Sequence, residues 1–454
     1  MKFFAFRFPV VVGVLCLVWS LTGCGEQPGD VVNNYYEEIS EGGYSGPSHT
    51  EAVGSGTLSE ITVAGTRVYV YEPPEYNDPV PMMTPIVYVY PDEPYDDFAA
   101  AKADIVSLGL NEIADDEKGV VIMVNPVGRS WGPGDVEVYK ALMSFVYSGH
   151  SGLNKTFLNL QYMIGEGSGA DFIHTYMTVN AARIAAVATF GGSNVVPGGS
   201  VALPAYLAGR ATAIGGGTDY TLAYYRGVNG ATGDPETEGT KSIYANVPGR
   251  GGTSDPVKKV IVNNSDDITG FTKDGISDAY HSLFRYTTRA ALFTRIYDDF
   301  NTPEVFTLLP RPNVEELGLT MNIVNEGSNN RWYEWVPNEV LANTASNVPL
   351  VLVLHGGGDH EVYEAESNGW VAMAREERFI VVAPKTNTNK TSNLTLINDM
   401  ITKYPVIDKS RIYVTGFSQG STGLSNTLND KAAVEQFAAM ALFSWGWCLS
   451  LRWL

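Results

Sequence analysis

The segment GFSQG, residues 416–420, has the Gly-x-Ser-x-Gly pattern that places a serine nucleophile at a sharp turn between a strand and a helix. It follows the β-prone run RIYVT and precedes QGSTGLSNTLND, which we predict to be helical. Gly416 and Gly420 would allow the tight turn, and Ser418 would lie at the helix N-terminus, where negative charge is stabilised. The pattern predicts acyl transfer through Ser418.

A second glycine-rich segment, His355-Gly356-Gly357-Gly358, directly follows the apolar run LVLVL. Glycines let a backbone approach a substrate carbonyl closely. The N–H of Gly357 or Gly358, together with the N–H of Gln419, would then form an oxyanion hole. The two segments together predict hydrolysis of a carboxylic ester, a reaction that needs no cofactor.

The same segment offers an alternative, because His355, Asp359 and His360 are all possible metal ligands. The two histidines are five residues apart on a glycine-rich loop, which lacks the rigid scaffold of a metal site. We therefore predict that the protein holds no metal here.

Three further stretches carry a family resemblance. YEWVPNEV with PLVLVLHGGG, AREERFIVVAPK, and IDKSRIYVTGFSQGS resemble the α/β-hydrolase esterases that include polyhydroxybutyrate depolymerases, feruloyl esterases and acetylxylan esterases. The resemblance covers residues 330–444 and, more weakly, 66–300. It implies that Ser418 is the nucleophile and that an ester-bearing polymer or a small ester is the substrate.

The sequence departs from this family after the serine. In the family the acid and the histidine follow the nucleophile along the chain. No histidine follows Ser418, and the carboxylates after it are Asp430 and Glu435. The last residues, WGWCLSLRWL, are rich in tryptophan and free of acids. We expect a domain cut short by a frameshift or premature stop, and inactive in this form; a genuine short tail is the alternative.

The chain contains an internal repeat. Four sequence blocks recur in the same order, and Arg67 pairs with Arg331 and Pro85 with Pro349 at an offset of 264 residues. The block YMIGEGSGADF, from Tyr162, matches YVTGFSQGSTG, from Tyr413, at an offset of 251. Four ordered blocks predict two homologous domains.

In each copy, apolar runs alternate with predicted helices, which is typical of a mostly parallel sheet. The predicted fold class is α/β: two α/β-hydrolase-type domains with mostly parallel sheets, the second incomplete at its C-terminus. We assign residues 59–305 to a degenerate first domain and residues 306–454 to a truncated second domain. The expected elements include strands at 85–90, 120–124, 349–354 and 379–383, and a helix near 288–300.

The first copy has lost the residues that would do chemistry. Gly167 stands at the nucleophile position, and YPDEP replaces HGGG. Ser168 is displaced by one residue, which would turn its hydroxyl away from the tip of the turn. Asp219 and His281 stand roughly where an acid and a histidine would stand, although His281 is better explained as a histidine at the surface or at the edge of the core. The alternative function is therefore a non-catalytic lipoprotein that binds glycan or polymer through this domain.

The N-terminus has the pattern of an exported protein. Residues 1–23 combine Lys2 and Arg7 with an apolar run, and LTGC, ending at Cys24, resembles a bacterial lipobox. We expect lipidation of Cys24, a flexible tether at 24–58, and an extracytoplasmic, membrane-anchored protein; an ordinary signal peptide or a single membrane anchor is the alternative. The net charge of −20 disfavours nucleic acid as a partner.

Overall fold

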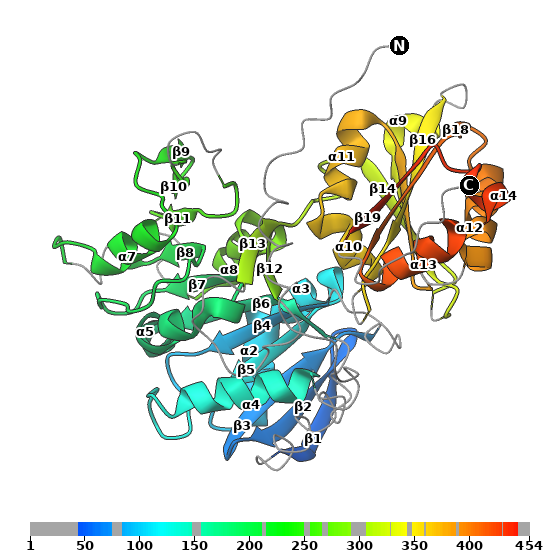
Figure 1. Ribbon diagram of the computed structural model, residues 1–454. Coiled ribbons are helices and arrows are strands. Elements are labelled where there is room, and N and C mark those ends of the chain that lie inside the picture. The colour runs from blue at the N-terminus through cyan, green and yellow to red at the C-terminus, as the bar shows by residue number, and fades with distance from the viewer. Residues whose placement is uncertain are drawn as a thin grey trace, which may run out of the picture.

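The computed structural model describes residues 44–74, 84–147, 156–210, 215–248, 255–265, 271–291, 306–326, 328–342, 347–357, 360–386, 390–428 and 430–443. In these ranges the chain forms an eleven-stranded sheet, a six-stranded sheet and a two-stranded sheet (Figure 1). We call residues 44–291 the amino-terminal unit and residues 319–443 the carboxy-terminal unit. Both large sheets are mixed and carry helices, so the predicted α/β fold class is confirmed.

The eleven-stranded sheet has a parallel centre and antiparallel ends. Its strand order is β1-β2-β3-β5-β4-β6-β7-β8-β11-β10-β9, and the pairs from β5 to β11 are parallel. Its strands are β1 Ser45–Val53, β2 Gly56–Val63, β3 Thr66–Glu72, β4 Thr84–Tyr90, β5 Val120–Val124, β6 Thr156–Glu166, β7 Ala186–Phe190, β8 Ala205–Ala208, β9 Glu236–Glu238, β10 Lys241–Tyr244 and β11 Val260–Asn263.

β4, β5 and β7 are buried along their whole length, because helices cover both faces of this sheet. Val138 and Leu142 of one helix belong to the apolar cluster on one face, and Ile105, Leu110 and Ile276 of others belong to the cluster on the opposite face. The helices are α2 Phe98–Ser107, α3 Leu110–Glu117, α4 Asp135–Tyr147, α5 Gly167–Phe172, α7 Tyr220–Val228 and α8 Lys273–Ser282.

The six-stranded sheet of the carboxy-terminal unit has the order β14-β15-β17-β16-β18-β19. Its strands are β14 Leu319–Val324, β15 Trp332–Pro337, β16 Val348–Leu354, β17 Ile380–Pro384, β18 Ile407–Phe417 and β19 Ala439–Phe443. The helices are α9 Asn338–Ala342, α10 Glu361–Ser367, α11 Trp370–Glu377, α12 Lys390–Lys403, α13 Gln419–Leu428 and α14 Lys431–Val434. Separate apolar clusters again fill the two faces.

The strand order β2-β3-β5-β4-β6-β7 of the first sheet has the same directions as β14-β15-β17-β16-β18-β19 of the second. The register agrees residue by residue. In β4–β6, Thr84 faces Thr156 and Tyr90 faces Gly165; in β16–β18, Val348 faces Ile407 and Leu354 faces Gly416. These pairs keep the offsets of 264 and 251 found in the sequence repeat, and both ladders carry an irregularity at the same place.

The structure differs from the predicted tether at 24–58. The chain is already β-structure from Ser45, where β1 pairs with β2 through a turn at Gly54 and Ser55. β1 is an edge strand with largely exposed polar side chains, so it lacks the alternating apolar pattern by which strands are recognised. Cys24, the predicted signal segment 1–23 and residues 24–43 lie outside the described residues, and the predictions on them remain predictions.

The predicted helix near 288–300 is wrong in its described part. Thr287–Ala291 forms strand β12, which pairs antiparallel with β13, Phe306–Pro310. β13 therefore pairs with the first of the predicted domains, although the predicted boundary placed it in the second. Thr287 and Thr288 are β-branched, which favours the strand. Among the residues that the structure describes, none of the helices combines the length and the apolar character that spanning a bilayer requires.

Candidate active site

The structure places Ser418 at the turn that the sequence predicts. β18 ends at Phe417, and α13 begins at Gln419. Ser418 has a φ of +47°, in the left-handed region that residues with a side chain rarely adopt. A strained serine between a strand and a helix projects its hydroxyl from the tip of the turn. Ser418 and Gln419 are both exposed, so the hydroxyl is open to a substrate.

The two glycines of the pattern are required by close packing of backbone. A Cβ at Gly416 would lie 2.6 Å from the carbonyl carbon of Gly420. A Cβ at Gly420 would lie 2.4 Å from the carbonyl oxygen of Leu354, the last residue of β16. Any side chain at either position would collide with backbone, so the glycines hold the start of α13 against the end of β16.

The glycine-rich loop that follows β16 lies beside the serine. A Cβ at Gly356 would be 2.9 Å from the Phe417 ring and 3.7 Å from the Ser418 Cβ, and one at Gly357 would be 3.2 Å from the Gln419 Oε1. The N–H of Gln419 belongs to the first turn of α13, where backbone N–H groups have no partner within the helix. The loop and this N–H therefore lie on the side of Ser418 where an oxyanion would form. Gly358 lies outside the described residues.

The end of β19 supports the same turn. The Ser418 N–H donates to the Phe443 carbonyl at 3.0 Å. The Ser421 hydroxyl accepts from the Phe443 N–H at 3.0 Å and lies 2.5 Å from the Gly416 carbonyl oxygen. Phe417, the residue before the serine, and Phe443 are both partly exposed, at 38% and 37%. Sequence reasoning missed Ser421 and Phe443, because a serine after the motif and the last residue of an apolar strand carry no distinguishing pattern.

The histidines near the glycine-rich loop are engaged elsewhere. Both ring nitrogens of His355 face backbone carbonyl oxygens, Nδ1 at 2.7 Å from Gly356 and Nε2 at 2.9 Å from Lys385. His360 caps α10, since its Nδ1 accepts from the Val362 N–H at 3.1 Å. The Nε2 of the same ring lies 3.6 Å from a Glu361 carboxylate oxygen and 3.2 Å from the Nη2 of Arg331. Neither ring is directed to take a proton from Ser418.

The metal alternative has no support in the described ranges, where no three acidic, histidine or cysteine side chains are grouped to hold an ion. The Arg331 guanidinium lies 3.2 Å from the Nε2 of His360. A permanent positive charge at that distance disfavours a cation on the ring. Asp359 lies outside the described residues.

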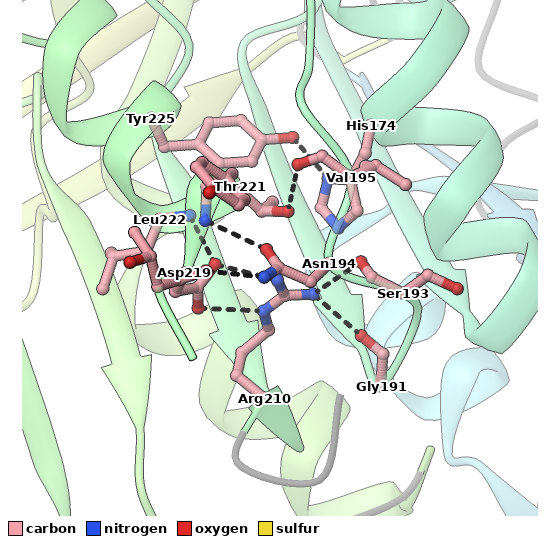
Figure 2. A network of polar contacts seen from close by, with 12 residues as sticks. His174, Gly191, Ser193, Asn194, Val195, Arg210, Asp219, Thr221, Leu222 and Tyr225 are labelled. Atoms are coloured by element: carbon pink, nitrogen blue, oxygen red, sulfur yellow. Dashed lines mark hydrogen bonds and ion pairs between the residues drawn. The ribbon is translucent and has the colours of Figure 1, made fainter. Parts of the chain in front are cut away.

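The predicted acid of the amino-terminal unit is already paired (Figure 2). Asp219 caps α7 by accepting from the Leu222 N–H at 2.9 Å. Its carboxylate also binds Arg210 with both oxygens, at 2.9 Å from Nη2 and 3.3 Å from Nε. Arg210 in turn donates to the carbonyls of Gly191 and Ser193. His281 is exposed on α8, and within the described ranges no hydrogen bond joins it to Asp219.

His174 lies close to this network and is structural. It is fully buried, and its Nδ1 is 3.0 Å from the Tyr225 hydroxyl (Figure 2). Burial, and then the nearby Arg210, lower the pKa of His174 to about 3. The ring is therefore neutral at physiological pH. Neither His174 nor the paired Asp219 is therefore placed to serve as the base or the acid of acyl transfer.

Comparison with known proteins finds esterases. No family model matches the chain. A bifunctional acetylxylan esterase/xylanase from Neocallimastix patriciarum is 34% identical over 89 residues, which are 17% of this chain and 13% of that protein. The chain thus matches only a small part of that curated relative.

Similar solved structures are also esterases and related hydrolases. They include an acetyl xylan esterase from Aspergillus awamori, at 21% identity over 27% of this chain and 51% of that one, with a TM-score of 0.20. An S-formylglutathione hydrolase from Agrobacterium tumefaciens has 14% identity over 33% of this chain and 63% of that one, with a TM-score of 0.26. The resemblance to esterases stated from the sequence is found again in these comparisons, each over a third of the chain or less.

Proposed function

We propose that the carboxy-terminal unit hydrolyses carboxylic esters, with Ser418 as the nucleophile. The observation that carries this proposal is the exposed Ser418 at φ +47°, held between β18 and α13 with the glycine-rich loop beside it. This is the geometry that acyl transfer requires, because the attacking oxygen and the backbone N–H groups approach one carbonyl from two sides. The name of the curated relative, an acetylxylan esterase, supports the same reaction class.

The reaction proceeds in two steps. The Ser418 Oγ attacks the ester carbonyl while its proton passes to a base, and the oxyanion accepts from the N–H of Gln419 and of the glycine-rich loop. Collapse of this intermediate forms the acyl-serine and releases the alcohol, which takes up a proton. Water then attacks the carbonyl of the acyl-serine, the bond between this carbonyl carbon and Oγ breaks, and the carboxylic acid leaves while Oγ takes up a proton. The partly exposed Phe417 directly precedes the nucleophile, and its ring lies beside the glycine-rich loop, so we propose an uncharged acyl chain, free or carried on a polysaccharide.

The amino-terminal unit has a different role in this proposal. We infer that it arose by duplication of the same unit, since strand order, register and the sequence offsets agree between the two sheets. Gly167 takes the place of the nucleophile, which favours a binding or structural role for this unit. A surface protein that binds glycan or polymer through this unit is the second candidate function.

The test of the esterase proposal uses a base supplied in solution. Imidazole can accept the Ser418 proton, so it should raise the rate of p-nitrophenyl butyrate hydrolysis by the purified chain. Ser418→Ala should remove the part of this rate that exceeds the rate with imidazole alone. Ser168→Ala, at the corresponding turn of the amino-terminal unit, is the matched control and should keep this additional rate. Equal rates in the two variants would refute the nucleophile assignment.

We also propose that the protein is exported, anchored by a lipid on Cys24 and inactive without an added base. The support for the anchor is the sequence LTGC after a short apolar run. A bacterial host expressing the chain should incorporate labelled palmitate, and Cys24→Ala should abolish the label while Cys448→Ala keeps it. Labelling that persists in Cys24→Ala would exclude this attachment site.

A further inference from the structure

The amino-terminal unit keeps the backbone of the nucleophile turn without the nucleophile. Gly167 has a φ of +50°, close to the +47° of Ser418, and is the first residue of α5, directly after β6. The flanking glycines are packed as in the other unit. A Cβ at Gly169 would lie 2.0 Å from the carbonyl oxygen of Tyr90, the last residue of β4. The geometry that presents a serine in one unit thus presents a bare glycine in the other.

A carboxylate occupies the space next to this glycine. Asp92 is the counterpart of Gly356 at the repeat offset of 264 residues. Its Oδ1 accepts from the Ser168 N–H at 2.6 Å, and the Ser168 hydroxyl donates to its backbone carbonyl at 2.5 Å. Ser168 is the counterpart of Gln419 at the offset of 251. The N–H that would bind an oxyanion in the carboxy-terminal unit therefore binds an internal carboxylate here.

The same carboxylate leaves no room for a side chain at position 167. A Cβ on Gly167 would lie 2.2 Å from the Asp92 Oδ1, 2.4 Å from its Cγ and 2.9 Å from its Oδ2. Real Cβ atoms do not approach other atoms so closely, so either the new side chain or Asp92 has to move. The two positions are consequently linked, because a side chain at position 167 requires the exposed Asp92 side chain to turn away from Ser168.

A second carboxylate strengthens the effect. Glu166 stands where the other unit has Phe417. Burial raises the pKa of Glu166, and the carboxylates of Asp92 and Asp104 raise it further, so these groups lie close enough to interact. The oxyanion of a substrate at this turn would lie close to the carboxylates of Asp92 and Glu166 and would be repelled by them. The corresponding residues of the carboxy-terminal unit, Gly356 and Phe417, carry no charge.

We propose that the Asp92 carboxylate is an internal ligand of the turn between β6 and α5. It occupies the position that the oxyanion of a substrate would take, and it thereby closes this unit to ester substrates. Restoring a serine at position 167 would then not restore catalysis, because the oxyanion donor is already taken. The closed amino-terminal unit thus differs from the open carboxy-terminal unit at two linked positions, where Asp92 and Gly167 replace Gly356 and Ser418. The elbow becomes a contact that holds the loop after β4 against the start of α5.

The experiment measures stability and amide exchange in the full chain, so it is independent of Ser418 and of the esterase proposal. Gly167→Ala introduces the clashing Cβ. Gly239→Ala is the matched control, since Gly239 has a φ of +58° and a Cβ added there would have no atom within 4 Å. We expect Gly167→Ala to lower the melting temperature by roughly 3–10 °C more than Gly239→Ala. Adding Asp92→Ala to Gly167→Ala should recover most of that difference.

Hydrogen exchange tests the contact without any change at position 167. Asp92→Ala should speed exchange of the Ser168 amide at least tenfold, whereas Asp92→Asn, which keeps an oxygen acceptor, should have a much smaller effect. This measurement decides the question even if Gly167→Ala does not fold. Equal temperature losses in the two glycine variants, no recovery on adding Asp92→Ala, or unchanged exchange in Asp92→Ala would each overturn the proposal.

Discussion

The purified 454-residue chain is expected to hydrolyse p-nitrophenyl butyrate on the order of 10⁶-fold more slowly than a hydrolase with a complete Ser-His-acid triad. A serine hydroxyl is a weak nucleophile at neutral pH unless a base takes its proton. In the described part of the carboxy-terminal unit, both ring nitrogens of His355 face carbonyl oxygens, and the Nδ1 of His360 caps α10. What remains is stabilisation of the oxyanion by backbone N–H groups, which alone gives far less than the triad.

Two measurements check this expectation. Steady-state hydrolysis without imidazole should barely exceed that of Ser418→Ala, and a fluorophosphonate probe should label Ser418 slowly. Fast turnover that disappears in Ser418→Ala would contradict the prediction. It would mean that a base reaches Ser418 from another part of the protein, and His281, an exposed histidine on α8, would be the first residue to replace.

The second large effect is expected from Glu361→Ala. Glu361 and Arg331 form a buried ion pair, with side chains 2% and 1% exposed. The Nε and Nη2 of Arg331 both donate to one oxygen of Glu361, at 2.8 Å and 2.6 Å. Removing the carboxylate leaves a guanidinium in the interior without the charge that faces it, so we expect a loss of about 3–5 kcal/mol in the free energy of unfolding.

The contribution of this ion pair to the free energy of unfolding should decrease as the pH falls. Burial opposes ionisation of Glu361, but His360 and Arg331 outweigh it and hold the pKa of the carboxyl below its usual value. A carboxyl whose pKa is lowered on folding stabilises the protein above its unfolded pKa, and this stabilisation is lost as the pH falls through the folded pKa. Urea unfolding at pH 7 and pH 3 should therefore show a larger difference between wild type and Glu361→Ala at pH 7.

A matched variant separates charge from packing. Lys273 makes an ion pair with Glu112 that is exposed on both sides, with side chains 49% and 57% exposed. Lys273→Ala should cost at most about 1 kcal/mol, because water screens both charges. A loss in Glu361→Ala no larger than that in Lys273→Ala would show that the buried pair does not hold the start of β15 against the start of α10.

The sequence alone determined the local geometry of the site and the plan of the fold. The spacing of Gly416, Ser418 and Gly420 predicts the turn between β18 and α13, because only small residues let backbone pack that closely. Continuous apolar runs predict the buried strands β4, β5, β16 and β17, since strands covered on both faces cannot alternate. The repeat offsets correspond to the register of the two sheets.

Only the tertiary structure decided what each loop meets. Asp92 and Ser168 are 76 residues apart, and no sequence pattern around either residue indicates that they are in contact. They meet because β4 and β6 are neighbours in a parallel sheet, so that the loops after both strands leave from the same edge. For the same reason, the contacts of Arg210 with the carbonyls of Gly191 and Ser193, and of Ser421 with Phe443, became visible only with the sheet order. Sequence patterns report which local geometry a segment prefers, whereas contacts between loops depend on which strands lie side by side.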